Sequence, residues 1–497
     1  MTPHPVRRIS AVRRAVTGMA TCVLAAAMAG PGCAPSIKDP AVPVALPEAF
    51  RRTGEAEVPA KWWTAFGDDR LNELIEQALR DNLTLAGAWA RLEQARAAAR
   101  RSGAALLPSV DGSAGASRTA SAVEPFATTH DTSYSLGLTA SYEVDIWGRV
   151  RSTRDAARMD AAATREDLQA AAITVAASVA ETWFSLIEQA AQIRLLDEQM
   201  ETNSKLLELI TLRYGQGKVS ATDVLQQRQL LEATRGEKVR AEAAEALLRH
   251  QLAILLGRAP ADLDAKLPAK LPELPPLPAP GVPAEWLHRR PDVRSALLRV
   301  QAADHRIAAA IADKFPRLSL SATATTTAER IRDLFDNWMA SMAANVIAPL
   351  FDAGLRTAEV DRARAAASES FRLYGQTVLT ALKEVEDALV QEAQQRRLLE
   401  SLGKQRDLAR QSAQRTQEQY AKGAVEFLRY LTALLDYQRL QRSHLAARRE
   451  LVAIRVDLYR SLGARWDLQP PVPEPRRVRG PLERLGTATF GRNEEGQ

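Results

Sequence analysis

The sequence predicts a mainly α-helical chain with a small β part, built from two copies of one structural unit. Three observations predict this fold class. The apolar share of 46% includes only 5% aromatic residues, so it is mostly alanine and leucine, which favour long helices when charged residues are also abundant. Four short segments alternate apolar residues with small polar ones, as strands do. Several landmarks also recur about 206 residues apart.

Composition excludes several classes of protein. The 66 basic and 60 acidic side chains leave a modest net charge of +6. These charges are spread along the chain, which is typical of solvated helices and does not favour nucleic-acid binding. Two cysteines and six histidines cannot form a disulfide framework or a cysteine-rich zinc site. The chain also lacks a glycine-rich phosphate loop, a zinc-protease helix and a nucleophile elbow. We therefore expect no enzyme, no cofactor and no metal.

The N-terminus predicts an export signal. Arginines precede an apolar stretch at 15–29 that is too short to span a membrane. Small residues and Cys33 follow, so residues 1–32 resemble a lipoprotein-type signal peptide, with Cys33 as the acylated residue. The Gly-Pro-Gly-Cys box is atypical, and ordinary cleavage without lipid on Cys33 remains an alternative. The proline-rich residues 33–60 are expected to form an extended tether.

Helical periodicity of the first unit, residues 61–267, begins at Asp68 and Asp69, which can cap a helix. One helix is expected from there to Leu107, where Pro108 ends it. The next, 149–213, has neither proline nor glycine and would be about 100 Å long. Its seven-residue apolar spacing predicts coiled-coil packing. That stripe consists of Val179, Leu186, Ile193, Met200, Leu207 and Tyr214. A further helix is predicted over 221–256.

A proline-rich connector, 268–284, precedes the second unit, 285–468. The same pattern then returns, with helices predicted over 291–314, 356–420 and 426–462. The polar residues 469–497 are expected to form a C-terminal tail.

The four predicted strands are 109–119, 133–144, 317–327 and 338–347. In the clearest of them, apolar residues from Tyr134 to Tyr142 alternate with serine, glycine and threonine. One apolar face and one small, polar face are typical of a membrane-barrel strand. Two soluble hairpins are the alternative interpretation.

The internal repeat determines the predicted architecture. Pro108 and Pro316 each close a helix before a strand, and Gly148 precedes Gly354 by 206 residues. Four strands cannot close a barrel, and unpaired strand edges are not tolerated in lipid. A trimer would supply twelve strands, and its long helices would continue the barrel as a tube.

Several motifs resemble a known family. They are Trp62-Trp63 with Phe66-Gly67-Asp68, the Tyr142–Arg149 run YEVDIWGR, Arg289–Arg294, Phe315–Leu320, Pro349–Gly354 and Glu384–Leu389. Together they are similar to the TolC-like outer-membrane efflux proteins, specifically the NodT-type lipoprotein branch, over about residues 60–465.

This resemblance implies a homotrimer in the outer membrane of a Gram-negative bacterium, lipid-anchored and extending into the periplasm as an α-helical tunnel. It implies passive export of drugs, toxic compounds or metal ions, delivered by an inner-membrane pump and a periplasmic adaptor. Two alternatives remain at this point. One is the outer-membrane channel of a type I protein-secretion system, and the other is a periplasmic coiled-coil protein that transports nothing.

Two groups of candidate site residues follow from the repeat. The first marks the junctions where strands become helices and comprises Asp145, Trp147, Gly148, Asp352 and Gly354. We expect structural roles there, with Asp145 capping a helix and Trp147 at a membrane interface. The second group marks the turns at the opposite helix ends, the predicted periplasmic tips where adaptor or pump would dock. It comprises Tyr214, Gly217, Tyr420 and Gly423.

A candidate gate follows the second turn. Many family members carry an aspartate nine residues after the turn glycine, but here that position is Thr432. Asp436 lies one helical turn further on nearly the same face. The gate is therefore expected to consist either of Asp436 or of Thr432 with Leu431 and Leu435. A ring of three aspartates would favour cations. Alternatively, Asp436 is an ordinary solvated charge.

Overall fold

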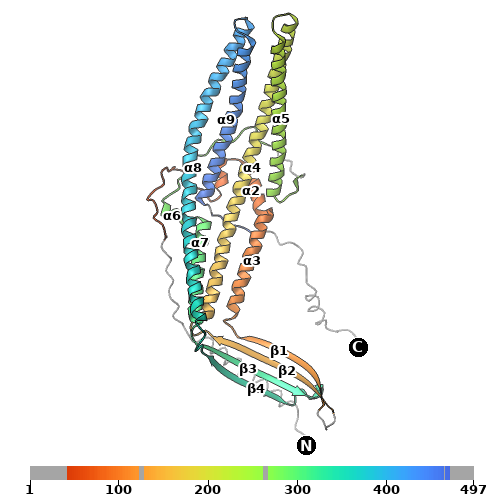
Figure 1. The fold of residues 1–497 in the computed structure, drawn as a ribbon, viewed down its shortest axis with the longest axis vertical. Helices are drawn as coiled ribbons and strands as arrows, with labels where there is room; N and C mark the ends of the chain where they lie inside the picture. Colours follow the sequence, from red (N-terminus) through yellow and green to blue (C-terminus); the bar gives the residue numbers. More distant parts are fainter. Residues whose placement is uncertain (1–41, 123–127, 261–266, 464, 471–497) are drawn as a thin grey trace, which may run out of the picture.

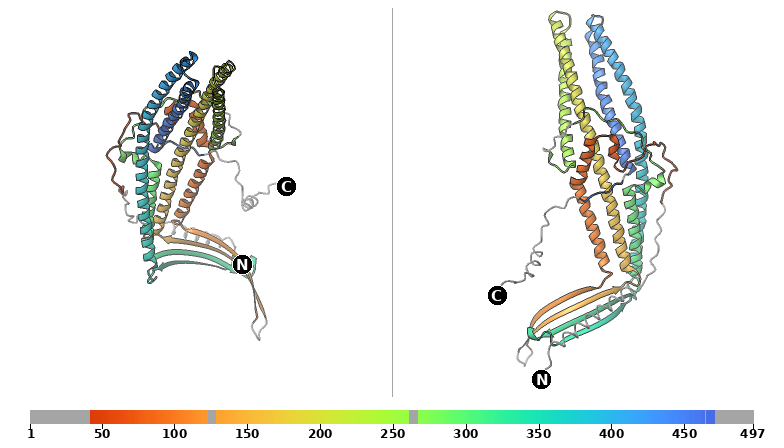
Figure 2. Two further views of the ribbon diagram at one scale, coloured as in Figure 1. Left: turned by 45° about the horizontal axis from the view of Figure 1, so that its top comes forward. Right: turned by 180° about the vertical axis from the view of Figure 1, so that it is seen from behind.

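The computed structural model describes residues 42–122, 128–260, 267–463 and 465–470. The predicted signal peptide, Cys33 and the tail beyond residue 470 lie outside them. The described chain is an elongated helical bundle with a curved four-stranded sheet at one end (Figures 1 and 2). The tips of four long helices form the other end, so the sheet and the helix tips are separated by the whole length of the bundle.

The order helix, two strands, long helix, helix occurs twice along the chain. The central helices α4 and α8 each contain 67 residues. The first half comprises α2 (Asp69–Asp81), α3 (Leu83–Ala104), β1 (Ser109–Ser121), β2 (Thr129–Val144), α4 (Arg149–Gly215) and α5 (Ala221–Leu255). The second comprises α6 (Pro283–Leu287), α7 (Pro291–Ala312), β3 (Arg317–Ala328), β4 (Trp338–Ile347), α8 (Leu355–Ala421) and α9 (Phe427–Leu462). Short 3₁₀ turns lie at Trp62–Phe66 and Ile331–Asp333.

The single helix expected between Asp68 and Leu107 is wrong, because the chain breaks at Asn82. The Asn82 backbone is extended, and its side-chain oxygen accepts a hydrogen bond from the Leu85 amide at 3.0 Å. Its side-chain amide donates to the Leu255 carbonyl at 2.9 Å. Asparagine competes well for such local bonds and is a strong N-cap. The periodicity continues through Asn82 in the sequence, which is why the break is not visible there.

The core surrounds the middle of α4, where Trp183 and Phe184 are fully buried against Trp62 and Trp63. The predicted heptad stripe is buried at Val179 and Leu186 and becomes half exposed at Tyr214, where fewer helices surround α4. Among the described helices, α4 alone has a stretch long and apolar enough to cross a membrane. Two-thirds of that stretch (67%) is buried in the bundle, as expected of a core helix.

The N-terminal segment 42–60 and the connector are extended and docked on the bundle. Phe50 packs edge-on against Trp286, and Ala56 forms a parallel bridge with Pro278. The connector is fixed by Arg455, whose fully buried guanidinium donates to the Pro275 and Pro276 carbonyls. The described part of the expected tether therefore belongs to the folded body.

A second buried bond fixes the same guanidinium. Arg455 forms an ion pair with Glu392 of α8, with an N–O distance of 2.5 Å. Because a lone buried charge is strongly unfavourable, the pair and the two carbonyls together make burial of this arginine possible.

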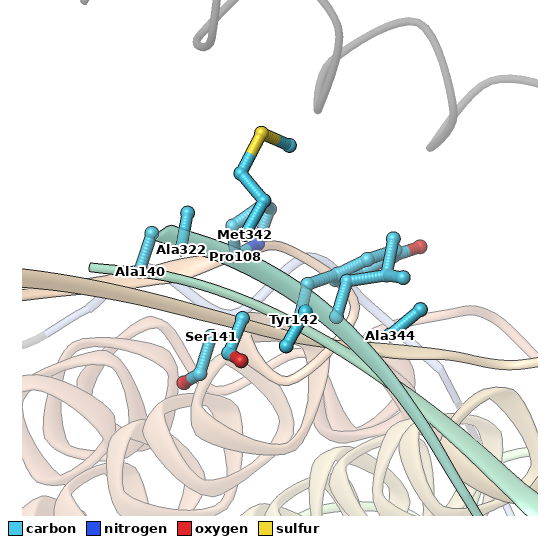
Figure 3. Close-up of a pocket in the computed structure, with 10 residues that line it drawn as sticks. Pro108, Ala140, Ser141, Tyr142, Ala322, Met342 and Ala344 are labelled. Carbon is cyan, nitrogen blue, oxygen red and sulfur yellow. The ribbon is translucent and has the colours of Figure 1, made fainter. Parts of the chain in front are cut away.

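The sheet is antiparallel in the order β1-β2-β3-β4, so β1 and β4 are its edges. Its register aligns apolar side chains across the strands on one face and polar side chains of β1, β2 and β3 on the other. Ala140 is opposite Ala322, which is opposite Met342, whereas the neighbouring row contains Ser141 and Ser321. Figure 3 shows Ala140, Ala322 and Met342 on one side of the sheet and Ser141 on the other. The sheet therefore has one apolar and one polar face.

Candidate functional site

The first strand–helix junction is built around Asp145. Its carboxylate accepts hydrogen bonds from the amides of Val150 and Arg151, at 3.0 and 2.9 Å, and so caps the first turn of α4. Gly148 directly precedes the helix with a φ of +76°, a left-handed conformation that favours glycine. Asp145 and Gly148 thus turn the chain from the sheet into the bundle.

The second strand–helix junction has the same arrangement, an aspartate that caps the helix and a glycine directly before it. Asp352 accepts hydrogen bonds from the amides of Gly354 and Arg356, at 3.0 and 3.3 Å. Gly354 precedes α8 with a φ of +87°. The Arg356 side chain, which hydrogen-bonds the carboxylate, lowers the pKa of Asp352, and the two amide donors act in the same direction. Asp352 is therefore charged in the folded protein and favours the positive end of the helix dipole.

Trp147 joins the two halves of the chain at this level. Its indole nitrogen donates to the Pro316 carbonyl at 2.8 Å, and its ring stacks on Phe315 at 4.8 Å. Apolar side chains around this contact are exposed. They are Leu107, Ile146, Trp147, Leu350 and Phe351. An amphipathic tryptophan amid exposed apolar residues is typical of a membrane–water interface.

Sequence reasoning missed the role of Glu143 at the first junction. Its carboxylate accepts two hydrogen bonds from the Arg149 guanidinium, at 3.0 and 2.7 Å. Hydrogen bonding to Glu143 raises the pKa of Arg149 against the opposing effect of burial. Both residues belong to the conspicuous YEVDIWGR run, but only the folded turn brings them together.

The two helix tips are closed by matching turns. Gly217 and Gly423 have φ values of +70° and +73°. In the first turn the Lys218 amide donates to the Arg213 carbonyl at 2.9 Å, and in the second the Ala424 amide donates to the Gln419 carbonyl at 2.8 Å. Each bond satisfies a helix-terminal carbonyl. Only the first tip adds a capping box, between Ser220 and Asp223.

The two tip tyrosines differ in exposure despite their equivalent positions. Tyr214 is 50% exposed, whereas Tyr420 is only 6% exposed. Tyr420 stacks on Tyr430 and lies under the Arg213 guanidinium, 4.7 Å from the ring centre. It therefore holds the two helical hairpins together, and Tyr214 is the tyrosine available to a partner.

The gate candidates also separate by exposure. Leu431 is buried in a cluster at the tips with Leu206 and Ile210 of α4. Thr432, Leu435 and Asp436 lie on the exposed face of α9, where Asp436 contacts Arg439 at 3.3 Å. Leu431 therefore supports this face from within the subunit and does not line it.

A buried polar cluster, absent from the sequence-based predictions, lies between the tips and the core. Asn203 of α4 is fully buried and donates to Thr234 of α5 at 3.2 Å. Gln227 and Gln438 donate to Asn203 at 2.9 and 3.1 Å. The cluster joins α4, α5 and α9, and its signal is the polar residues inside an otherwise apolar heptad pattern.

The described residues contain no group of three His, Cys, Asp or Glu side chains able to hold a metal ion. The features that stand out are instead the two-faced sheet, the junctions and the paired tips.

Comparison with known proteins gives a consistent result. The model of the family "Outer membrane efflux protein" matches the chain twice, over residues 74–258 and 282–464. Among curated proteins, the pyoverdine export outer membrane protein OpmQ of Pseudomonas aeruginosa is 31% identical, covering 82% of this chain and 87% of OpmQ. The cation efflux system protein CusC of Escherichia coli is 28% identical, covering 90% of this chain and 98% of CusC.

Solved structures agree with these sequence matches. The outer-membrane channel OprN superposes with a TM-score of 0.80 at 29% identity, covering 86% of this chain and 98% of OprN. CusC superposes with a TM-score of 0.79 at 27% identity, covering 87% of this chain and 99% of that chain.

Proposed function

The chain belongs to the outer membrane efflux protein family, and from this premise we propose that three copies form one channel through the outer membrane. The protein is an outer-membrane efflux component of a Gram-negative cell and extends into the periplasm. The observation that carries the trimer is the open sheet. Its edges β1 and β4 have no partner strand in the described chain, and lipid does not tolerate free backbone groups.

Three sheets of four strands give a twelve-stranded barrel, an ordinary size for an outer-membrane barrel. Its apolar face meets lipid and its serine- and threonine-rich face lines an aqueous pore. Edge β4 of one copy pairs with edge β1 of the next, so the assembly leaves no free edge. The exposed apolar residues around Trp147 form the periplasmic rim of the membrane-embedded part.

The helices continue this pore as a periplasmic tunnel about 100 Å long, because α4 and α8 each contain 67 residues. The two halves of the chain, 61–267 and 285–468, are structural repeats that contribute equivalent walls. Two matches of one family model and the matching junctions and turns support this proposal.

The tips are the proposed docking surface for a periplasmic adaptor and an inner-membrane pump. Tyr214 is exposed there, and the turns at Gly217 and Gly423 present backbone to a partner. Further along α9 from the tips, toward the sheet, Thr432, Leu435 and Asp436 form the proposed constriction. A passive channel needs no catalytic group or cofactor, so energy comes from the pump.

The proposed substrates are small solutes. OpmQ is named for pyoverdine export and CusC for cation efflux, and both relatives support this class over protein secretion or a purely structural role. A ring of three Asp436 carboxylates would attract cations at the constriction.

We also propose that Cys33 is the lipid-anchored first residue of the mature protein. Mass spectrometry of the N-terminal peptide should show a diacylglyceryl-modified cysteine. An unmodified N-terminus at another position would contradict this assignment.

The trimer and the channel are tested together on the full-length protein. Light scattering of the detergent-solubilised protein should give three chain masses, and planar bilayers should show ion conductance. A monomer or dimer mass would overturn the assembly. A trimer that conducts nothing, even after disruption of the constriction, would overturn the channel.

A further inference from the structure

We infer that Arg118 and Arg330 bind the phosphate groups of an outer-leaflet lipid. This inference rests on the proposed barrel, because it requires the apolar face of the sheet to meet lipid. Arg118 interrupts that face on β1, where Val110, Ala114 and Ala116 share its side of the strand by the two-residue alternation.

The strand register places the two arginines at the same end of the sheet. Arg118 is opposite Thr132 of β2, and the preceding row contains Ala116, Tyr134 and Ala328. Arg330 lies two residues beyond Ala328, with an extended backbone of φ −132° and ψ 142°. The chain bends at residues 329 and 330, so Arg330 lies in the loop at the same end of the sheet as Arg118. Arg118 is on β1 and Arg330 follows β3, and only β2 lies between these two strands, whose axes are about 10 Å apart.

This end of the sheet lies at the outer rim of the membrane. Thr132 is twelve residues from Val144, where the apolar face begins. Twelve strand residues extend about 40 Å, or about 30 Å along the membrane normal at a tilt near 40°. The apolar band of such barrels is about 25 Å tall. The guanidinium groups are therefore at the level of the outer headgroups, where an arginine costs little.

The loop between β3 and β4 also contains Glu329, Asp333 and Asp336, but within the described residues none of them forms an ion pair with Arg118 or Arg330. Neither Arg118 nor Arg330 forms an ion pair within the described part of the chain, although Arg332 in the same loop contacts Asp333 at 3.4 Å. Asp131 lies on β2 beside Thr132, and alternation directs its carboxylate to the opposite, polar face. Alternation thus directs Arg118 toward lipid, and both arginines are exposed without an acidic partner among the described residues.

The chemistry of the surroundings selects a phosphorylated lipid over free phosphate. Arginine binds phosphate through paired, charge-assisted hydrogen bonds. Exposed Ile331, Phe335 and Trp338 lie in the same loop and at the start of β4, where they can pack against acyl chains. A lipid with a phosphorylated headgroup can bind the arginines through its phosphate and the apolar side chains through its acyl chains.

The test is binding of purified lipid A by the full-length trimer in detergent, measured by native mass spectrometry. Three probes are compared: bisphosphorylated lipid A, lipid A with its phosphates removed, and inorganic phosphate as a competitor. We expect the bisphosphorylated form to bind, and the double variant R118Q/R330Q to lose about tenfold or more in affinity. The variant R118K/R330K, which keeps the charge, should recover part of that loss.

R332Q is the matched control, because it removes the same charge from the same loop at a side chain that already has an acidic partner. It should bind lipid A like the wild type. Equal binding of the phosphate-free lipid, or unchanged binding by R118Q/R330Q, would overturn the inference. Competition by low millimolar inorganic phosphate would also overturn it and indicate a site for free phosphate. Trimer mass and conductance, measured on the same samples, separate these outcomes from a failure of the proposed channel.

Discussion

Asp436 combines an ordinary surface ion pair with a position close to the helix tips. Its carboxylate is exposed on α9 and contacts Arg439 at 3.3 Å, as an ordinary surface pair would. What distinguishes it is its place beside the tips, with Leu435 and Thr432 on the same exposed face. Charge at a constriction acts on passing ions even when it adds little to stability.

Substitution D436A is expected to raise conductance and to reduce the preference for cations in planar bilayers, because in the proposed trimer it removes three charges from the proposed constriction. D457A is the matched control, since Asp457 also pairs at i,i+3 on α9, with Arg460, but lies far from the tips. Unchanged conductance in D436A would remove Asp436 from the gate.

The pKa of Glu188 is governed by its burial. Glu188 is 6% exposed in the core of α4, and burial raises its pKa while the hydrogen bond from Gln192 opposes that shift. A carboxyl with a raised pKa favours folding most at low pH. This contribution is lost as the pH rises from about 4.5 through the raised pKa.

Substitution E188Q is therefore expected to raise the melting temperature at pH 7–8 and to leave it nearly unchanged near pH 4. Thermal unfolding monitored at both pH values measures this difference. E201Q on the same helix is the control, because Glu201 is exposed and its pKa is lowered by hydrogen bonding to Lys205. A lower melting temperature for E188Q at pH 7–8 would contradict the assignment.

At the scale of elements, local chemistry fixed most boundaries. The long helices end at glycine turns and the strands follow Pro108 and Pro316, so the predicted ranges lie close to the observed ones. These signals act over a few residues, which is why the sequence alone shows them. The break at Asn82 escaped prediction because its side chain also bonds Leu255, 173 residues away.

Two glycines should respond in opposite directions to substitution by alanine. Gly217 has a φ of +70°, so G217A should destabilise the tip by about 1–2 kcal/mol although no atom lies within 4 Å of an added Cβ. Gly236 lies in exposed helix α5 with equally open space, and G236A should stabilise the protein by about 0.5–1 kcal/mol. Chemical denaturation measures both. Effects of the same sign would show that local backbone conformation is not the cause.

At the scale of the whole molecule, the sheet can be understood only as part of an assembly. Its two faces differ in polarity on β1, β2 and β3, and its edges have no partner strand among the described residues. The helical bundle has its own buried core, so the sheet is the part of the described chain that most needs partners.

Neighbouring residues on β2 test which face meets lipid. Leu138 is opposite Ala324 on the apolar face, and Thr139 is opposite Thr323 on the polar face. L138R should cost about 2–4 kcal/mol per subunit near the membrane centre and reduce the trimer recovered from outer membranes. T139R should assemble normally and lower cation conductance. Equal defects in both variants would contradict the proposed orientation of the barrel.

Periodicity, proline and glycine act locally, so the long helices, the strands with their two faces and the turns could be predicted from the sequence, whereas the break at Asn82 could not. Tertiary structure decided what depends on distant partners. It buried Tyr420 and left Tyr214 exposed at matching positions, and it assigned Leu431 to the interior. It also docked residues 42–60 on the bundle and joined Arg455 to Glu392 and to the connector. Each of these outcomes depends on which surfaces remain after the helices have packed, and no pattern within one segment contains that information.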